Sequence, residues 1–180
     1  MSKFLSALAI AIFMFSCSDN KPLAEEKKDS ATTETKKAAP ISYAYTARYS
    51  SAFEMGKHED VKTILDIWKA YEENKLGETK SLWGDTVTLE FDGFTFHGPI
   101  DSALKEGNAD RGRYTSVKDS IDAVFPVHST DKNEYWVGVW GREYTVDKKG
   151  KKDTVDIHEI WLLKNGKAAY MSQFRAHHKP

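Results

Sequence analysis

A helical stripe of apolar side chains opens the folded part of the chain. Between Glu59 and Leu76, apolar residues recur three and four positions apart, which is the spacing that places side chains on one face of an α-helix. The stripe consists of Val61, Ile64, Leu65, Trp68 and Tyr71. Gly77 is a residue type that commonly ends a helix. The pattern predicts an amphipathic helix over residues 59–76 and a short second helix over residues 78–83.

The pattern then changes to the alternation of apolar and polar positions that is typical of strands. Thr86–Phe91 alternates, Asp92-Gly93 is a turn signal, and Phe94–His97 returns as a partner strand. Pro99 is well placed to open a helix over residues 100–106. Further strands are predicted over Ser116–His128, Glu134–Val146, Val155–Leu163 and Lys167–Ala176. This order predicts an α+β domain, in which the helices pack on one face of a long, curved antiparallel sheet.

Two other segments of the folded part have simpler interpretations. Tyr43, Tyr45, Tyr49 and Phe53 are irregularly spaced aromatic residues, which we expect to form a lead-in that packs onto the domain. Residues 148–152, KKGKK, are predicted to be an exposed turn between two strands.

The first residues of the chain have the pattern of a signal peptide. Lys3 supplies a positive charge, residues 4–15 are almost wholly apolar, and small Ser16 precedes Cys17. A helix needs about 20 apolar residues to cross a bilayer, so this segment is too short to be a permanent anchor. Residues 1–16 are therefore predicted to be a signal that is removed.

The junction Met14-Phe15-Ser16-Cys17 resembles the lipobox of bacterial lipoproteins, although Phe15 is bulkier than the usual residue. The resemblance implies acylation of the Cys17 thiol, with palmitate or a related chain, and cleavage before that residue. Two or three acyl chains attach a protein durably to a membrane. The implied location is the cell envelope of a diderm bacterium, in the outer membrane or facing the periplasm. The alternative is an ordinary secretory signal with an incidental cysteine.

Residues 17–42 differ in composition from both neighbouring segments. Over residues 18–40, Lys, Glu, Thr, Ala and Ser dominate, and Leu23 is the only large apolar side chain. Such a segment buries too little surface to offset its ordering entropy, so it is predicted to be a disordered tether. The folded domain is predicted over residues 43–180.

Charge and motif content exclude several classes of function. The formal net charge of -1 gives no basic excess for binding nucleic acid. One cysteine excludes an internal disulfide and a CxxC motif. Asp156 and His158 share a strand face, but zinc needs three or four converging ligands, so no metal is predicted. No glycine-rich phosphate loop is present, and no cofactor is predicted.

The folded part resembles a nuclear transport factor 2-like (SnoaL-like) domain over about residues 59–176. The resemblance rests on soft motifs: Trp68-Lys69-Ala70-Tyr71, Leu82-Trp83-Gly84-Asp85, Phe96-His97-Gly98-Pro99-Ile100, Trp140-Gly141-Arg142-Glu143-Tyr144, and the final hairpin from His158 to Phe174. The family implies a cone, in which a strongly bent sheet wraps around helices and leaves a pocket at its open end. Its members include isomerases, cyclases, hydratases and epoxide hydrolases, and many have no demonstrated activity. Homodimers through the sheet are common in the family.

The implied pocket would be lined by the first helix, the junction near His97 and the last strands. This placement nominates six ligand-binding residues: Trp68, Tyr71, His97, Trp140, His158 and Gln173. The alternative to ligand binding is core packing for the aromatic residues and a structural hydrogen bond for the two histidines. Asp122, with Arg142 as its partner, is a candidate acid–base group, but neither residue falls on a catalytic motif of the family.

Three functions remain open at this point. The first is a membrane-tethered domain that binds a small apolar or amphipathic ligand without catalysis. The second is an isomerase, cyclase or hydratase that uses His97, His158 or Asp122. The third is a module that binds another envelope protein through the sheet face. A buried carboxylate or histidine that faces an open cavity would favour the second function.

Overall fold

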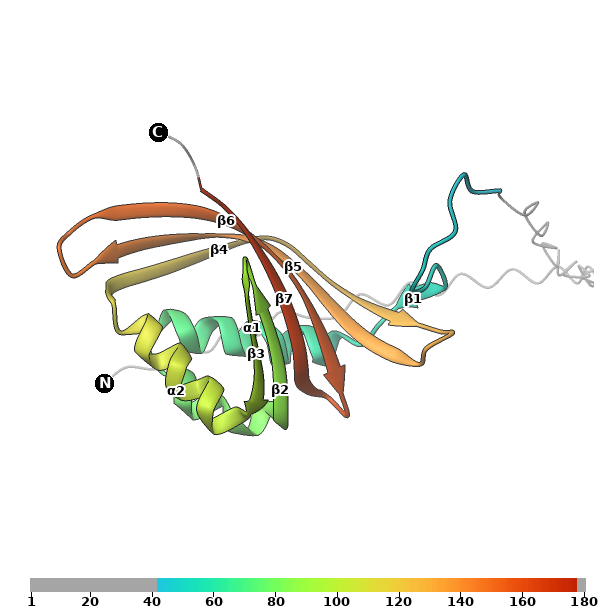
Figure 1. Cartoon of the computed structure of the whole chain (residues 1–180), viewed down its shortest axis with the longest axis horizontal. Helices are drawn as coiled ribbons and strands as arrows, with labels where there is room; N and C mark the ends of the chain where they lie inside the picture. The colour runs from blue at the N-terminus through green and yellow to red at the C-terminus, as the bar shows by residue number, and fades with distance from the viewer. Residues whose placement is uncertain (1–41, 178–180) are drawn as a thin grey trace, which may run out of the picture. The chain divides into compact units, whose positions relative to one another are not determined.

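Two helices pack against one face of a seven-stranded sheet in the computed structural model, which describes residues 42–177 (Figure 1). The predicted signal peptide and nearly all of the predicted tether lie outside the described residues. The elements follow in the order β1 (Phe53–Met55), α1 (His58–Glu72), the 3₁₀ helix η1 (Leu76–Leu82), β2 (Trp83–Phe91), β3 (Phe94–Pro99), α2 (Ile100–Arg111), β4 (Tyr114–Ser129), β5 (Glu134–Asp147), β6 (Lys152–Lys164) and β7 (Lys167–His177). No helix in this range is long and apolar enough to cross a membrane.

The sheet has the strand order β1-β4-β5-β6-β7-β2-β3. The structure confirms the predicted α+β class, with a strongly curved, open sheet around the helices (Figure 1). All neighbouring strands are antiparallel except β2 and β7, which run parallel, with Leu89 opposite Met171. The expectation of a wholly antiparallel sheet is therefore wrong at this pair. Alternation within a strand reveals which side chains share a face, but it contains no information about a partner 80 residues away.

Helix α1 ends earlier than the sequence predicts. The backbone N–H of Lys75 donates to the Ala70 carbonyl at 2.7 Å, and that of Asn74 donates to the Tyr71 carbonyl at 3.0 Å. With Asn74 in the left-handed region (φ 60°), these two bonds form a Schellman motif. The predicted end at Gly77 is wrong, because Asn74 takes the terminating conformation and Gly77 lies inside η1.

The core lies between α1 and the concave face of the sheet. From α1, Ile64 and Trp68 of the predicted stripe pack with Val137 and Val139 of β5. Ile67, which the predicted stripe did not include, is buried with them. Trp68 needs a glycine opposite it. A Cβ on Gly141 would lie 2.7 Å from the Ser120 carbonyl oxygen and 3.2 Å from the Trp68 ring. The absence of that Cβ lets the indole approach the sheet closely, and the indole forms part of the cavity wall described below.

The aromatic lead-in packs onto the domain at one residue. The Tyr49 ring meets the Trp136 ring edge-to-face at 6.0 Å between centroids, and Phe53 opens the edge strand β1. Tyr43 and Tyr45 are 75% and 90% exposed, so the expectation that they pack onto the domain is wrong. The lysine-rich turn between β5 and β6 is exposed, as predicted.

Candidate functional site

A cavity of about 820 Å³ lies between the helices and the concave face of the sheet. Its apolar wall comes from both helices, η1 and four strands, and consists of Ile67, Trp68, Leu76, Trp83, Leu89, Phe96, Ile100, Ala103, Leu104, Ile157, Trp161 and Met171. The tip of the β2–β3 hairpin contributes Phe91 and Phe94, which stack at 6.3 Å and are partly exposed. The size and lining are those of a small-molecule site.

Glu159 is buried in the wall of this cavity, with three side chains donating to its carboxylate. The indole Nε1–H groups of Trp68 and Trp161 donate to Oε2 at 2.6 and 2.7 Å, and Gln173 Nε2 donates to Oε1 at 2.6 Å. Burial raises the pKa of Glu159, and the three hydrogen bonds oppose that rise. The carboxylate thus joins α1, β6 and β7 at one point.

Asp119, from β4, also lines the cavity, and its environment differs from that of Glu159. Its Oδ1 atom is buried and has no hydrogen-bond donor among the described residues. Burial raises the pKa of Asp119 to about 7, and the charges of Glu143, Glu72 and Glu159 add to the rise. A carboxyl group with a pKa near neutrality, facing a cavity, has the properties of an acid–base or charge-pairing group.

The carboxylates beside Asp119 have cationic partners. Glu143, 4% exposed, pairs with Arg175, although burial still raises its pKa. Glu72 is also buried, which by itself would raise its pKa. Hydrogen bonds from Lys69, Lys118 and the backbone N–H of Asp119 outweigh that effect and hold the pKa of Glu72 at about 2. Asp119 is thus surrounded by negative groups whose own charges are compensated.

Tyr71 supplies a neutral polar group at the side of the cavity. Its hydroxyl donates to Asp110 Oδ2 at 2.8 Å, and the Arg113 guanidinium lies 3.2 Å from the other oxygen of Asp110. Burial raises the pKa of Tyr71, so the hydroxyl stays protonated at neutral pH. The Arg111 guanidinium fixes this end of α1 by donating to the Tyr71 and Glu72 carbonyls at 2.9 Å.

Solved structures of other proteins have the same arrangement of helices and sheet. A putative SnoaL-like polyketide cyclase from Jannaschia sp. CCS1 is 14% identical, with a TM-score of 0.54 over 66% of this chain and 86% of that one. A nuclear transport factor 2-like protein of unknown function from Exiguobacterium sp. 255-15 is 19% identical, with a TM-score of 0.53 over 65% and 98%. An LEH-like epoxide hydrolase from M. tuberculosis is 11% identical, with a TM-score of 0.56 over 66% and 84%. This chain has the nuclear transport factor 2-like fold.

Neither a protein-family model nor a curated protein matches the sequence. At these identities the likeness shows the nuclear transport factor 2-like fold and no reaction, because one fold hosts many functions. The resemblance found in the sequence is confirmed at the level of the fold.

Three of the six predicted ligand-binding residues line the cavity of the nuclear transport factor 2-like domain: Trp68, Tyr71 and Gln173. Two others are exposed on the outer face of the sheet, where Trp140 and His158 stack at 5.6 Å between ring centroids. Their expected placement in the pocket is therefore wrong, and the strand register explains why. Val139, Glu159 and Gln173 are paired across the strands on the inner face, so the next pair, Trp140 and His158, points outward.

His97 lies outside the cavity for the same reason. Phe96 faces the cavity from β3, and His97 follows it on the opposite face, exposed, with Nδ1 2.8 Å from Thr88 Oγ1. The predicted acid–base group Asp122 and its expected partner Arg142 are also not where the sequence prediction placed them. Asp122 is exposed at an irregularity of β4, and Arg142 pairs with Asp156 at 2.7 Å and not with Asp122. The expected Asp122–Arg142 pair is wrong.

The acidic groups of the cavity were not predicted from the sequence: Asp119, Glu143, Glu159 and Asp110, with the associated Arg175. A signal for Glu159 was present, because it interrupts an alternating apolar series between Ile157 and Trp161 on β6. A charged residue at an inward-facing strand position is rarely buried without a function or a partner. No group of three or more possible metal ligands converges within residues 42–177.

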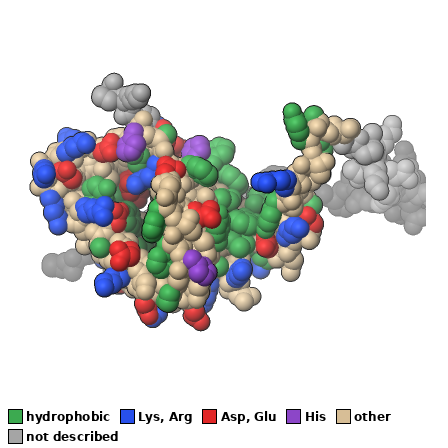
Figure 2. All heavy atoms as spheres, in the orientation of Figure 1, with side chains coloured by type: hydrophobic (Ala, Val, Ile, Leu, Met, Phe, Trp, Pro, Cys, Tyr) green, Lys and Arg blue, Asp and Glu red, His purple; other side chains and the backbone are tan. Residues whose placement is uncertain are grey.

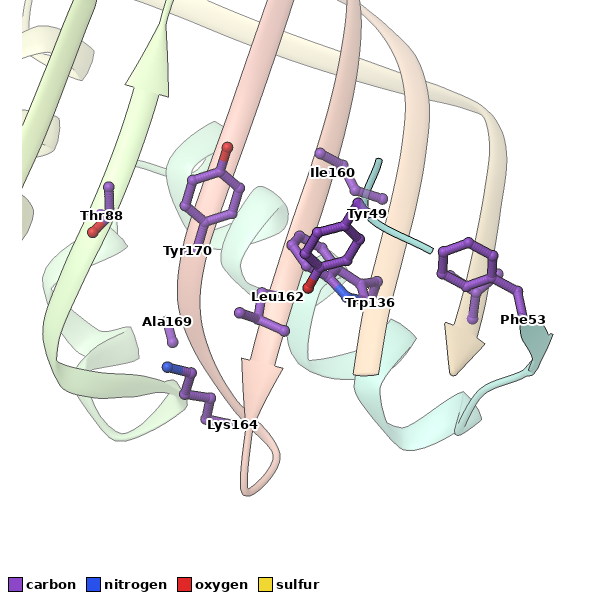
Figure 3. A pocket seen from close by; sticks show the side chains of 10 residues that line it. Tyr49, Phe53, Thr88, Trp136, Ile160, Leu162, Lys164, Ala169 and Tyr170 are labelled. Carbon is purple, nitrogen blue, oxygen red and sulfur yellow. The ribbon is translucent and has the colours of Figure 1, made fainter. Parts of the chain in front are cut away.

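The outer face of the sheet has a groove of its own, of about 680 Å³ (Figure 3). Trp136 lies between Tyr49 and Tyr170, and its buried Nε1 has no hydrogen-bond partner among the described residues. Ile160 and Leu162 extend the apolar surface along β6. Figure 2 shows hydrophobic side chains gathered in the recess between the body of the domain and the segment before β1.

We predict that Asp119→Asn stabilises the domain in a pH-dependent manner. The pKa of Asp119 is about 7 when folded and near its ordinary 3.8 when unfolded, so ionisation costs stability as pH rises from about 4 to about 7. The neutral amide avoids that cost. Allowing for the part of the side chain that water reaches, the free energy of unfolding should rise by roughly 2 kcal/mol at pH 8.5 and change little at pH 4.

Chemical denaturation at the two pH values measures this difference. Asp122→Asn, on the same strand but exposed, is the matched control and should change stability equally at both pH values. A stabilisation by Asp119→Asn that does not depend on pH would contradict the shifted titration.

Proposed function

We propose that this protein binds a small apolar or amphipathic ligand in the cavity of its nuclear transport factor 2-like domain, without catalysing a reaction. The observation that carries the proposal is the 820 Å³ cavity, walled by aromatic and aliphatic side chains and containing a few buried polar groups. Burial of a ligand there would remove apolar surface of both the ligand and the cavity wall from water, which favours binding. Tyr71, Asp119, Gln173 and Glu159 supply the polar atoms that would orient the ligand.

A second candidate function is acid–base catalysis with Asp119 as the proton-transferring group. The observation in its favour is a cavity-lining carboxyl group whose pKa is about 7. Two of the structural neighbours are a putative SnoaL-like polyketide cyclase and an LEH-like epoxide hydrolase. Asp119→Asn distinguishes the two functions. If the protein is an enzyme, the unmodified chain should turn over a bound compound and Asp119→Asn should not. If it only binds the ligand, neither protein should show turnover.

We further propose that the mature chain begins at Cys17 and is anchored by acyl chains on that residue. The support is in the sequence: an apolar segment over residues 4–15 ends in the lipobox-like Met14-Phe15-Ser16-Cys17. The cavity would then be held near the membrane of a diderm cell envelope, facing the periplasm or on the outer membrane. That location would give the domain access to apolar molecules that partition into the bilayer.

The outer face of the sheet supports a proposal about assembly. Trp140 and Phe174 are 47% and 64% exposed, and the groove around Trp136 adjoins them on the same face. We propose that a second copy of the chain covers this face, since contiguous exposed apolar surface marks interaction sites. Light scattering after size-exclusion chromatography should give a dimer mass, and a monomer at micromolar concentration would contradict the proposal.

The cavity proposal predicts that a bulky side chain inside the cavity abolishes ligand binding. Ala103 lines the cavity from α2, so Ala103→Phe should occupy part of its volume. A screen of envelope lipids, sterol-like and aromatic compounds should find compounds that raise the Tm of the unmodified chain by several degrees at about 100 times Kd. Ala103→Phe should lose that rise.

Ala109→Phe, exposed on the same helix, is the matched control and should keep the ligand-induced rise. Circular dichroism checks that both variants fold. Binding that survives Ala103→Phe in a folded protein would place the ligand elsewhere.

The anchoring proposal predicts that Cys17→Ala abolishes lipid attachment. Mass spectrometry of the unmodified protein from membranes should show chains that begin at residue 17 and carry the mass of acyl groups. Radiolabelled palmitate should enter the unmodified chain and Ser18→Ala, the matched control, but not Cys17→Ala. Recovery of an unmodified chain that still carries Met1, or that lacks lipid at its first residue, would refute the anchor.

A further inference from the structure

We infer that the cavity selects amphipathic ligands that carry a protonated amine, with Asp119 as the counter-ion of that amine. This inference rests on the proposed function, because it names the chemical class of the ligand for the same cavity. Three observations support it: the charge balance of the cavity wall, the unpaired oxygen of Asp119, and the aromatic side chains that line the same cavity.

The charge balance of the wall is acidic. Six carboxyl side chains line the cavity, Asp92, Glu106, Asp110, Asp119, Glu143 and Glu159, against the two guanidinium groups of Arg113 and Arg175. Both guanidinium groups are already paired, Arg113 with Asp110 and Arg175 with Glu143. An anionic ligand would therefore have to compete with these carboxylates for a cation while facing the remaining negative charges.

Among the carboxyl groups that the strands contribute to this wall, Asp119 has an oxygen without a hydrogen-bond partner in the described part of the chain. Glu159 accepts hydrogen bonds at both oxygens, and Glu143 has its arginine. The Oδ1 atom of Asp119 is buried without a donor among residues 42–177. A desolvated carboxylate oxygen without a partner is costly, and a cation in contact with the carboxylate removes that cost. An alcohol would supply a donor but no charge.

The aromatic lining of the cavity suits the apolar part of such a ligand. Trp68, Tyr71 and Trp161 line the same cavity and present ring surfaces that pack against an apolar chain or ring. The faces of aromatic rings also attract ammonium groups, by about 0.5–2 kcal/mol. The cavity thus combines an apolar wall for the body of the ligand with one negative contact for its head.

Binding of the amine should be coupled to the titration of Asp119. The charged groups that act on Asp119 are Glu72 and Lys69 on α1, Glu143 on β5 and Glu159 on β6. Burial, together with the net effect of these charges, raises the pKa of Asp119 to about 7, so the carboxyl group is about half protonated at pH 7. A bound ammonium group favours the ionised form, so binding should release about half a proton at that pH.

The experiment uses three compounds that differ only in the head group: 4-phenylbutylamine, 4-phenylbutanol and 5-phenylpentanoate. Isothermal calorimetry at pH 7 is done on the mature chain, from residue 17 onward, with Cys17→Ser so that no acyl chain competes for the cavity. We expect the amine to bind about tenfold or more tightly than the alcohol and the carboxylate to bind most weakly. Repeating the titration in phosphate and in HEPES measures the released proton.

Two variants test the role of Asp119. Asp119→Asn should reduce the preference for the amine over the alcohol to less than about threefold and abolish proton release. Asp122→Asn, exposed on the same strand, should behave as the unmodified chain. Since Asp119→Asn is expected to stabilise the domain, a failure to fold is not the expected outcome, and alcohol binding by this variant shows that its cavity is intact.

The possible failures are distinguishable. If the alcohol binds as tightly as the amine, or if Asp119→Asn keeps the amine preference, the inference about ligand class is overturned while the cavity remains a binding site. If the carboxylate binds most tightly, the inference is also overturned, and the arginine pairs must open. If none of the three compounds binds, both the inference and the proposed function for ligands of this size fail.

Discussion

The contact between Trp68 and Glu159 is the interaction on which the rest of this structure depends. It joins the helix that forms the centre of the core to the inner face of the sheet, through a 2.6 Å hydrogen bond from an indole N–H to a buried carboxylate. The indole can approach that closely because Gly141 has no side chain beneath it. The Trp68 ring thus belongs to α1, contacts the inner face of the sheet and forms part of the cavity wall. Loss of this ring would leave a buried carboxylate short of a donor and a large void in the core.

The cavity imposes an electrostatic cost that a plain apolar core would avoid. Asp119, Glu143 and Glu159 all have raised pKa values because they are buried near one another. Stable proteins rarely accumulate buried carboxyl groups without a reason, since each must be hydrogen-bonded, paired or protonated. Here Glu159 is hydrogen-bonded and Glu143 is paired, which leaves Asp119 as the group that depends on a proton or a ligand. Strained or costly features of this kind concentrate at functional sites.

The two faces of the sheet have different properties although the same strands supply both. On the inner face, Glu159 and Gln173 point toward the helices and the cavity. On the outer face, Trp140 and His158 stack on one another. The groove around Trp136 lies on the same face (Figure 3). A shift of one residue in any strand register would exchange these sets. The binding cavity and the assembly surface are therefore separated by the thickness of one sheet.

The sequence by itself determined the elements of the domain. Helical spacing found the stripe of α1, alternation and turn signals found the long strands, and their order gave the α+β class. Only the tertiary structure decided the parallel pairing of β2 with β7, the end of α1 at Asn74, and which residues face the cavity. Alternation shows that Trp140 and Val139 lie on opposite faces, but it does not show which face the helices cover. Asp119 gained its properties from groups on other strands and on α1, which come together only when the sheet curves around the helix. Local periodicity is a property of the chain, whereas a shifted pKa depends on neighbours that are distant in sequence. For that reason the fold and part of the cavity lining could be predicted, while the acidic groups of the site could not.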